Sequence, residues 1–156
     1  MLQGIPLFNK TMKKIKEDPL QEDGLLVIIV GDGVGARAAQ QFAAKIPKEA
    51  KLVTIDPYYA DKKYAKYRKK VREGLVGLPA EKVNLPKLLA GNPTHVILYA
   101  NQAHTDMGAF LARLKKATKA KLYGICTTCH NRGFATRDKK ATARPGGRGS
   151  HIYYRL

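Results

Sequence analysis

The chain has 156 residues, of which 44% are hydrophobic, so it is long enough and apolar enough to build a core of its own. Its charge is strongly unbalanced, because 29 lysines and arginines face 12 acidic residues and give a net charge of +17. Such an excess destabilises the compact state and is typical of proteins that bind nucleic acid. No apolar run has bilayer length and residues 1–10 lack a signal-peptide pattern, which predicts a cytoplasmic protein without a membrane partner.

The predicted elements begin with a short helix within residues 1–23, in which Met12 and Ile15 face inward. The continuous apolar run at 25–30 follows and is typical of a central strand of a parallel sheet. Apolar side chains at helical spacing then predict a helix ending before Pro47, and residues 51–56 predict the second strand.

The same alternation continues in the second half of the chain. Residues 60–75 predict a helix that includes Leu75 on its apolar stripe, 81–85 a strand and 94–101 another strand. A further helix has the apolar stripe Met107, Phe110, Leu111 and Leu114 and precedes a strand at 121–127. Strands alternating with helices predict an α/β fold, with a doubly wound, mostly parallel sheet and helices on both faces.

Composition divides the chain into three predicted parts. These are a leader with a short helix over 1–23, a central α/β domain over 24–130, and a basic Gly- and Arg-rich extension over 131–156. The last six residues, 151–156, are able to add a final strand to the sheet.

A glycine loop, GDGVGA, follows the first predicted strand. Gly31 and Gly33 match the first two positions of G-x-G-x-x-G/A, and Ala36 fills the third. Asp56 stands at the end of the second predicted strand, where a carboxylate accepts hydrogen bonds from a ribose. The combination predicts a nucleotide-like ligand, held against the start of the following helix.

Four segments together resemble motifs of class I S-adenosylmethionine-dependent methyltransferases: VIIVGDGVGA, LVTIDP, HVILYANQAH and KLYGIC. They correspond to the first, second, fourth and fifth strands of that Rossmann-like fold. The resemblance implies that Gly31, Gly33 and Gly35 surround the methionine part of S-adenosylmethionine, that Asp56 binds its ribose, and that Asn101 lines the catalytic face. The family usually closes its sheet with a hairpin, for which little chain remains after the fifth strand.

His104 lies just past the fourth predicted strand, where open α/β sheets form active sites, and is a candidate general base or phosphate ligand. His95 lies within that strand and is expected to be structural. Catalytic contacts to the methyl acceptor are therefore assigned to Asn101 or His104.

Other ligands and functions stay open at this point. A nicotinamide dinucleotide uses the same glycine loop and Asp56, and a scaffold without a cofactor needs the glycines only for a tight turn. Ile29 stands where the methyltransferase family usually has an acid. The two functions are thus a methyltransferase-like protein that transfers a methyl group to RNA, and a non-enzymatic RNA- or DNA-binding component of a ribonucleoprotein or nucleocapsid.

Basic side chains cluster in the predicted helix 60–75, in 113–121 and in the extension, and they predict contacts with nucleic acid, with RNA favoured over DNA. Tyr58 and Tyr59 lie beside the first cluster as candidates for stacking on bases. The candidate nucleic-acid ligands are Lys62, Lys63, Lys66, Arg68, Lys69, Lys70, Arg137, Lys139, Lys140, Arg144 and Arg148.

Cys126, Cys129 and His130 form a C-x-x-C-H motif, which also occurs at sites of covalent haem attachment. Haem attachment needs export, and no export signal is present. Two thiolates and an imidazole are suitable zinc ligands, so zinc is a candidate cofactor. The alternatives are a redox-active pair and a Cys126 that merely packs as a small hydrophobic residue.

Overall fold

A computed structural model describes residues 5–18, 24–31, 37–62, 74–101, 107–127, 141–142 and 150–154. Most of the predicted helix over 60–75 lies outside these ranges, as does most of the basic extension. In the described part of the chain, no helix combines the length and the hydrophobicity that a bilayer span requires.

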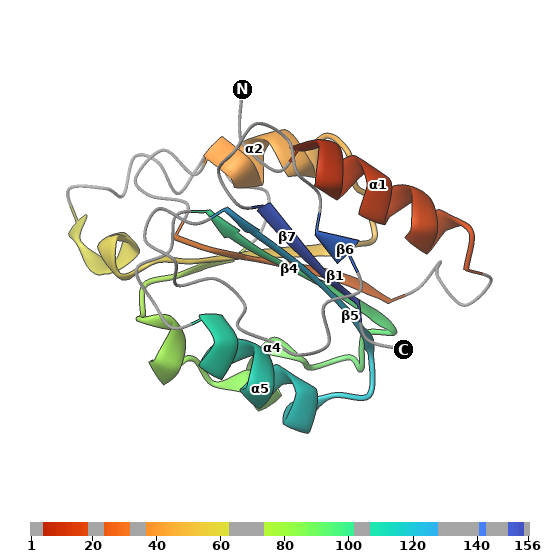
Figure 1. Ribbon diagram of the computed structural model, residues 1–156. Coiled ribbons are helices and arrows are strands. Elements are labelled where there is room, and N and C mark those ends of the chain that lie inside the picture. The colour runs from red at the N-terminus through yellow and green to blue at the C-terminus, as the bar shows by residue number, and fades with distance from the viewer. Residues whose placement is uncertain are drawn as a thin grey trace.

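The centre of the molecule is a seven-stranded sheet in the order β3-β2-β1-β4-β5-β7-β6 (Figure 1). The strands are β1 (Leu25–Val30), β2 (Lys51–Ile55), β3 (Leu75–Val76), β4 (His95–Asn101), β5 (Lys121–Thr127), β6 (Ala141–Thr142) and β7 (Ser150–Tyr154). Strands β3, β2, β1, β4 and β5 pair in parallel, whereas β7 is antiparallel to both β5 and β6.

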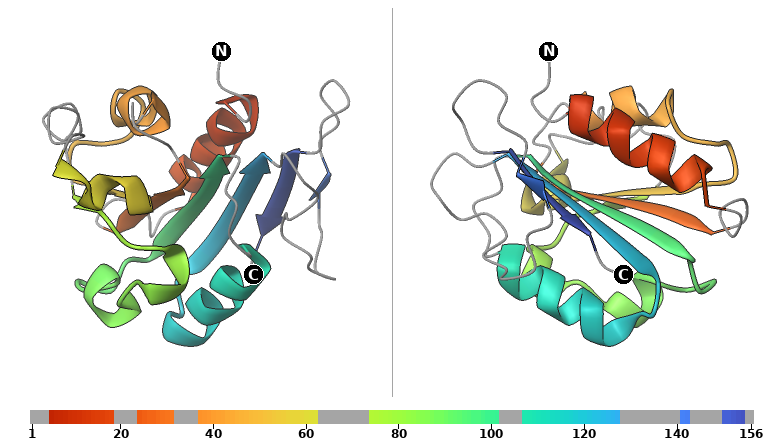
Figure 2. Two further views of the ribbon diagram at one scale, coloured as in Figure 1. Left: turned by 90° about the vertical axis from the view of Figure 1, so that its left-hand side faces the viewer. Right: turned by 45° about the vertical axis from the view of Figure 1, so that its right-hand side comes forward.

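Helices cover both faces of the sheet (Figures 1 and 2). One face carries α1 (Ile5–Lys16) and α2 (Arg37–Ala43), and the other carries α4 (Leu85–Leu88) and α5 (Met107–Ala117). Two 3₁₀ turns, η1 (Pro57–Ala60) and η3 (Ala80–Lys82), connect the strands to these layers. The predicted α/β class, with a mostly parallel sheet between helices, is confirmed.

Strand β1 is buried along its whole length because it supplies side chains to both layers. Leu25, Val27 and Ile29 join the core under α1 and α2. The alternate residues of β1 join the second core, under α4 and α5. This explains why the strand is continuously apolar rather than alternating.

The predicted side-chain stripes of α1 and α5 are confirmed. Met12 and Ile15 are buried on the inner side of α1, together with Phe8, whose ring stacks on Phe42 of α2 with 3.9 Å between centroids. In α5 the buried residues are Met107, Phe110, Leu111 and Leu114. Helical periodicity was therefore a sufficient signal in both segments.

The predicted strand at 81–85 is wrong, and these residues form η3 and the start of α4. The Asn84 side chain accepts a hydrogen bond of 3.0 Å from the backbone N–H of Lys87 and so caps α4, whose first turn contains Pro86. The strand that pairs with β2 is instead β3, so Leu75 lies in a strand and not on a helical stripe.

The sheet ends in the antiparallel pair β6 and β7. This pair joins the rest of the sheet through β7, whose Ile152 is paired with Ile125 of β5. Within the final strand predicted at 151–156, residues 151–154 lie in β7, and the short chain after β5 includes a closing antiparallel pair. Strand β6 has only two residues, and most of the antiparallel pairing is between β7 and β5. The division into leader, central domain and extension stays a prediction, although α1 shares a core with β1.

Candidate active site

The carboxyl ends of three parallel strands meet at one edge of the sheet. Val30 pairs with Ile55 of β2 and with Ala100 of β4. The residues that follow these positions, Gly31, Asp56 and Asn101, therefore lie at the same edge, which we call the carboxyl edge. Residues far apart in the sequence are brought together where open α/β sheets bind ligands.

Gly31 turns the chain away from the sheet directly after β1. Its φ angle is +77°, in the region that favours glycine, and its N–H donates a hydrogen bond of 3.1 Å to the carbonyl of Ile55. The first glycine of the loop is therefore required by backbone geometry, and the lack of a side chain leaves the backbone accessible at this edge.

Asp56 is fixed by hydrogen bonds of both its backbone and its side chain. Its N–H donates to the carbonyl of Val76 at 3.0 Å, and its Oδ1 accepts from the N–H of Tyr58 at 3.0 Å, which caps η1. The residue is 5% exposed. Since a buried carboxylate is stable only with hydrogen-bond donors around it, this orientation is set by the fold.

The end of β3 packs closely against η1. A Cβ atom added to Gly77 would lie 2.6 Å from the backbone nitrogen of Ala60, so a side chain does not fit there. This close approach of two backbones holds the segment after Asp56 in place beside the carboxyl edge.

The two candidate stacking tyrosines differ sharply in exposure. Tyr58 is 60% exposed, but Tyr59 is 2% exposed and belongs to the core under α1 and α2. The prediction that Tyr59 stacks on bases is therefore wrong, because consecutive side chains of a 3₁₀ turn point in directions about 120° apart, and that of Tyr59 enters the core. Tyr58 stays a candidate.

Only part of the predicted site falls within the described residues. Lys62 is exposed just after η1, and the backbone of Asn101 ends β4. The candidates outside the described residues are Gly33, Gly35, Lys63, Lys66, Arg68, Lys69, Lys70, His104, Cys129, His130, Arg137, Lys139, Lys140, Arg144 and Arg148. Their roles stay predictions.

The backbone of Cys126 pairs with Ala100 and His151 within the sheet. Among the residues that the structure describes, no group of three or more His, Cys, Asp or Glu side chains gathers as a metal site would require. Because Cys129 and His130 lie outside them, the zinc site stays a prediction.

Arg113 of α5 has a structural role that sequence reasoning missed. Its guanidinium donates to the carbonyls of Ala80 and Glu81 at 3.1 Å and of Val83 at 2.9 Å, and it lies over the ring of Phe110. Arg113 thus holds η3 against α5. It was predicted as part of the basic cluster at 113–121, but its donors serve the fold.

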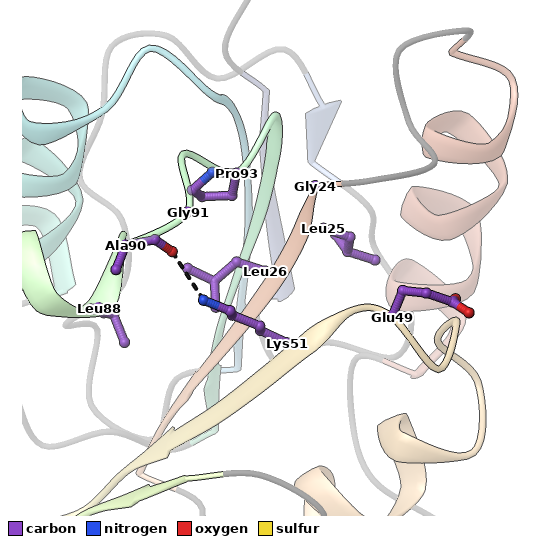
Figure 3. A pocket seen from close by; sticks show the side chains of 9 residues that line it. All are labelled: Gly24, Leu25, Leu26, Glu49, Lys51, Leu88, Ala90, Gly91 and Pro93. Carbon is purple, nitrogen blue, oxygen red and sulfur yellow. Dashed lines mark hydrogen bonds between the residues drawn. The ribbon is translucent and has the colours of Figure 1, made fainter.

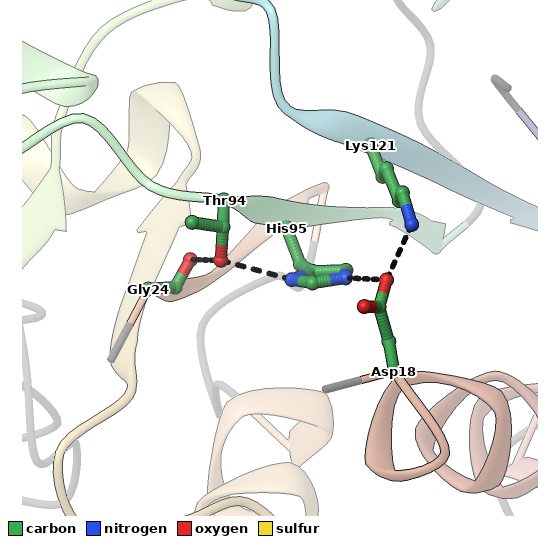
Figure 4. A network of polar contacts seen from close by, with 5 residues as sticks. All are labelled: Asp18, Gly24, Thr94, His95 and Lys121. Atoms are coloured by element: carbon green, nitrogen blue, oxygen red, sulfur yellow. Dashed lines mark hydrogen bonds and ion pairs between the residues drawn. The ribbon is translucent and has the colours of Figure 1, made fainter. Parts of the chain in front are cut away.

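The opposite, amino edge of the sheet contains a polar network (Figure 4). His95 is 1% exposed, its Nδ1 lies 2.9 Å from Oγ1 of Thr94, and its Nε2 lies 2.9 Å from Oδ2 of Asp18. Lys121 contacts the same Asp18 oxygen, and this hydrogen bond raises the pKa of the Lys121 ammonium. The predicted structural role of His95 is confirmed, and its partner Asp18 was missed.

A small pocket also lies at the amino edge, between β1, β2 and the loop before β4 (Figure 3). Lys51 is one of its lining residues and donates from Nζ to the carbonyl of Ala90 at 3.0 Å. The volume of the pocket, about 70 Å³, is too small for a nucleotide, whose sites are several-fold larger. Because the pocket lies at the amino edge, it is also separate from the carboxyl edge.

Comparisons with known proteins identify the fold. No protein-family profile matches the chain, and a search of curated proteins finds no match either. An rRNA methylase from Streptococcus thermophilus is 11% identical, with a TM-score of 0.56 over 93% of this chain and 92% of its own. A methyltransferase from Geobacter sulfurreducens is 20% identical, with a TM-score of 0.56 over 100% of this chain and 91% of its own.

The protein has the fold of a class I methyltransferase. At these identities the likeness concerns the fold, and it agrees with the resemblance found in the sequence. In this methyltransferase-like fold, Gly31 and Asp56 directly follow the two adjacent strands β1 and β2, as the sequence motifs imply.

Proposed function

We propose that the protein is an S-adenosylmethionine-dependent methyltransferase that acts on RNA. The observation that carries this proposal is the pair of adjacent strand ends in the methyltransferase-like sheet. There, Gly31 has a positive φ angle, and the buried carboxylate of Asp56 lies one strand away.

The residues at this edge are chemically suited to S-adenosylmethionine. A carboxylate accepts hydrogen bonds from the two hydroxyls of a ribose, and Asp56 is held in one orientation by the N–H of Tyr58. A glycine backbone allows close approach of the ligand beside it. Ile29 stands where the family usually has an acid, and its side chain is fully buried in the core. We therefore assign the contacts with the methionine part of the cofactor to the glycine loop.

When bound, S-adenosylmethionine supplies a methyl group that its sulfonium has already activated. The chain's own contribution is then to position the methyl acceptor in line with that bond. Asn101 ends β4 next to β1 and is the described residue we assign to this task. His104 is the second candidate.

RNA as the substrate class is supported by charge and by likeness. The net charge of +17 favours a polyanion, and a structure similar to this one is an rRNA methylase. Lys62 is exposed just beyond η1, and Tyr58 projects from η1 beside Asp56, so both are placed to meet an RNA strand near the carboxyl edge.

Calorimetric titration of the full chain with S-adenosylmethionine, and separately with NAD, tests the proposal. Asp56→Asn should weaken S-adenosylmethionine binding by about tenfold or more, because the charged acceptor is lost while Asn still caps η1. Asp61→Asn is the matched control, since Asp61 is an exposed carboxylate at the other end of η1, and its affinity should equal that of the wild type.

The outcomes separate the functions that the sequence left open. Binding of NAD in place of S-adenosylmethionine contradicts the proposal in favour of a dinucleotide enzyme. Binding of neither cofactor, together with retained RNA binding, contradicts it in favour of a non-enzymatic RNA-binding scaffold.

A further inference from the structure

We propose that the outer surface of α1 and α2 binds the phosphate backbone of RNA. We call this surface the α1/α2 basic face, and it is defined by the exposed residues Lys10, Lys13, Lys14, Lys16, Arg37, Lys45 and Lys48. These residues belong to none of the three clusters that the sequence pattern predicted.

The two helices form one continuous surface. Their inner sides are joined by the stacked rings of Phe8 and Phe42, 3.9 Å apart, and they lie on the same face of the sheet (Figures 1 and 2). Just after α2, Nζ of Lys45 donates a hydrogen bond of 3.3 Å to Oδ1 of Asn9 in α1. The acceptor of this hydrogen bond is a neutral amide and not a carboxylate. The ammonium charge of Lys45 therefore adds to that of the α1 lysines.

The positive charge of α1 is concentrated on one side. Phe8, Met12 and Ile15 are buried, whereas the lysines between them, Lys10, Lys13 and Lys14, are exposed. Lys10 and Lys14 are one helical turn apart, where like charges destabilise a helix and a bound anion relieves the repulsion.

The exposed acidic residues around this face are fewer than its basic residues. Glu17 and Glu49 are the exposed acids among the described residues that flank the two helices. Asp18 has a side chain that is 11% exposed, and it contacts His95 and Lys121 of the sheet. Oδ2 of Asp18 thus faces the sheet residues His95 and Lys121.

The chemistry of the face favours a nucleic-acid backbone over a membrane. A helix that binds a bilayer surface exposes an apolar side for insertion, whereas the apolar side of α1 is buried in the core. The exposed large hydrophobic residues of the described part are Tyr58 and Leu78, and neither lies on α1 or α2. The choice of RNA among polyanions rests on the proposed function, but the binding surface does not.

The test compares two triple variants of the full chain in binding a short fluorescein-labelled single-stranded RNA, followed by anisotropy at several salt concentrations. Lys10→Gln/Lys13→Gln/Lys14→Gln should weaken binding at low salt by about tenfold or more and flatten the slope of log K against log salt by about 2. The control removes equal charge from exposed lysines outside this face and outside the three predicted clusters, as Lys51→Gln/Lys82→Gln/Lys87→Gln, and should keep the wild-type slope.

A third variant, Lys10→Arg/Lys13→Arg/Lys14→Arg, preserves the charge and should bind RNA like the wild type, which would assign the loss in the Gln variant to charge. Equal losses in the two Gln variants overturn the proposal, because net charge alone then explains binding. Wild-type binding by the α1 Gln variant overturns it as well. Calorimetry with S-adenosylmethionine is independent of these results, so failure to bind the cofactor removes the proposed function and leaves the RNA surface standing.

Discussion

The two edges of the sheet use polar residues in different ways. At the amino edge, Asp18, His95 and Lys121 contact one another although they are separated by up to 103 residues. At the carboxyl edge, the side chain of Asp56 bonds to the backbone two residues away. One edge is held by long-range side-chain contacts, and the other is preorganised by local backbone geometry.

This difference separates stability from binding. A long-range buried contact exists only in the folded chain, so its loss is expected to lower the free energy of unfolding. A side chain that caps a neighbouring turn keeps its geometry when Asn replaces Asp. Loss of the charge is therefore expected to weaken ligand binding more than it destabilises the fold. Substitutions at the two edges should therefore have opposite signatures.

The largest effect on stability is expected for Asp18→Ala at the amino edge. It leaves Nε2 of the buried His95 without this partner and should lower the free energy of unfolding by about 2 kcal/mol in urea denaturation. The control is Glu17→Ala, an exposed neighbour, which should change it by less than about 0.5 kcal/mol. If both variants are equally stable, the network does not hold the amino edge.

A smaller loss of stability is expected for Gly31→Ala at the carboxyl edge, together with a loss of binding. An alanine at φ +77° is strained by about 1 kcal/mol. Its Cβ also occupies the edge where we place S-adenosylmethionine, so calorimetric affinity should fall with it. Gly74→Ala, where an added Cβ meets nothing within 4 Å, should alter neither quantity. A change in stability without a change in affinity would place the ligand elsewhere.

The smallest effect concerns alkaline pH. The hydrogen bond that Lys121 donates to Asp18 raises the pKa of Lys121 above its ordinary value of 10.5 in the folded state. The stabilisation is therefore complete below pH 10.5 and is lost as the pH rises through the raised pKa. Urea denaturation below and above pH 10.5 should show a small decrease in the free energy of unfolding at the higher pH, and this decrease should be absent in Lys121→Met. An equal decrease in the variant would assign it to another group.

Local patterns were reliable where burial follows directly from sequence. The continuous apolar run of β1 and the helical spacing in α5 both predicted the observed elements, since each residue's environment is set by its own segment. The strand predicted at 81–85 failed for the opposite reason, because a cap from Asn84 and the carbonyl contacts of Arg113 override its apolar residues.

At the candidate site, the sequence alone placed Gly31 and Asp56 at strand ends, because a glycine loop and a following acid are local signals. It did not distinguish Tyr58 from Tyr59, whose exposures are set by packing of η1 on the core. Nor did it show that α1 and α2 share one basic surface, which requires the Phe8–Phe42 contact between separate segments.

The amino-acid sequence by itself therefore determined the α/β alternation, the central strands and the positions of the glycine loop and Asp56, since periodicity and turn chemistry act over a few residues. The tertiary structure decided the partners of Asp18, the place of β3 and β7 in the sheet, and the gathering of lysines on the α1/α2 basic face. These features depend on which distant segments become neighbours, and the neighbours are fixed only when the strands pair into one sheet and both cores pack.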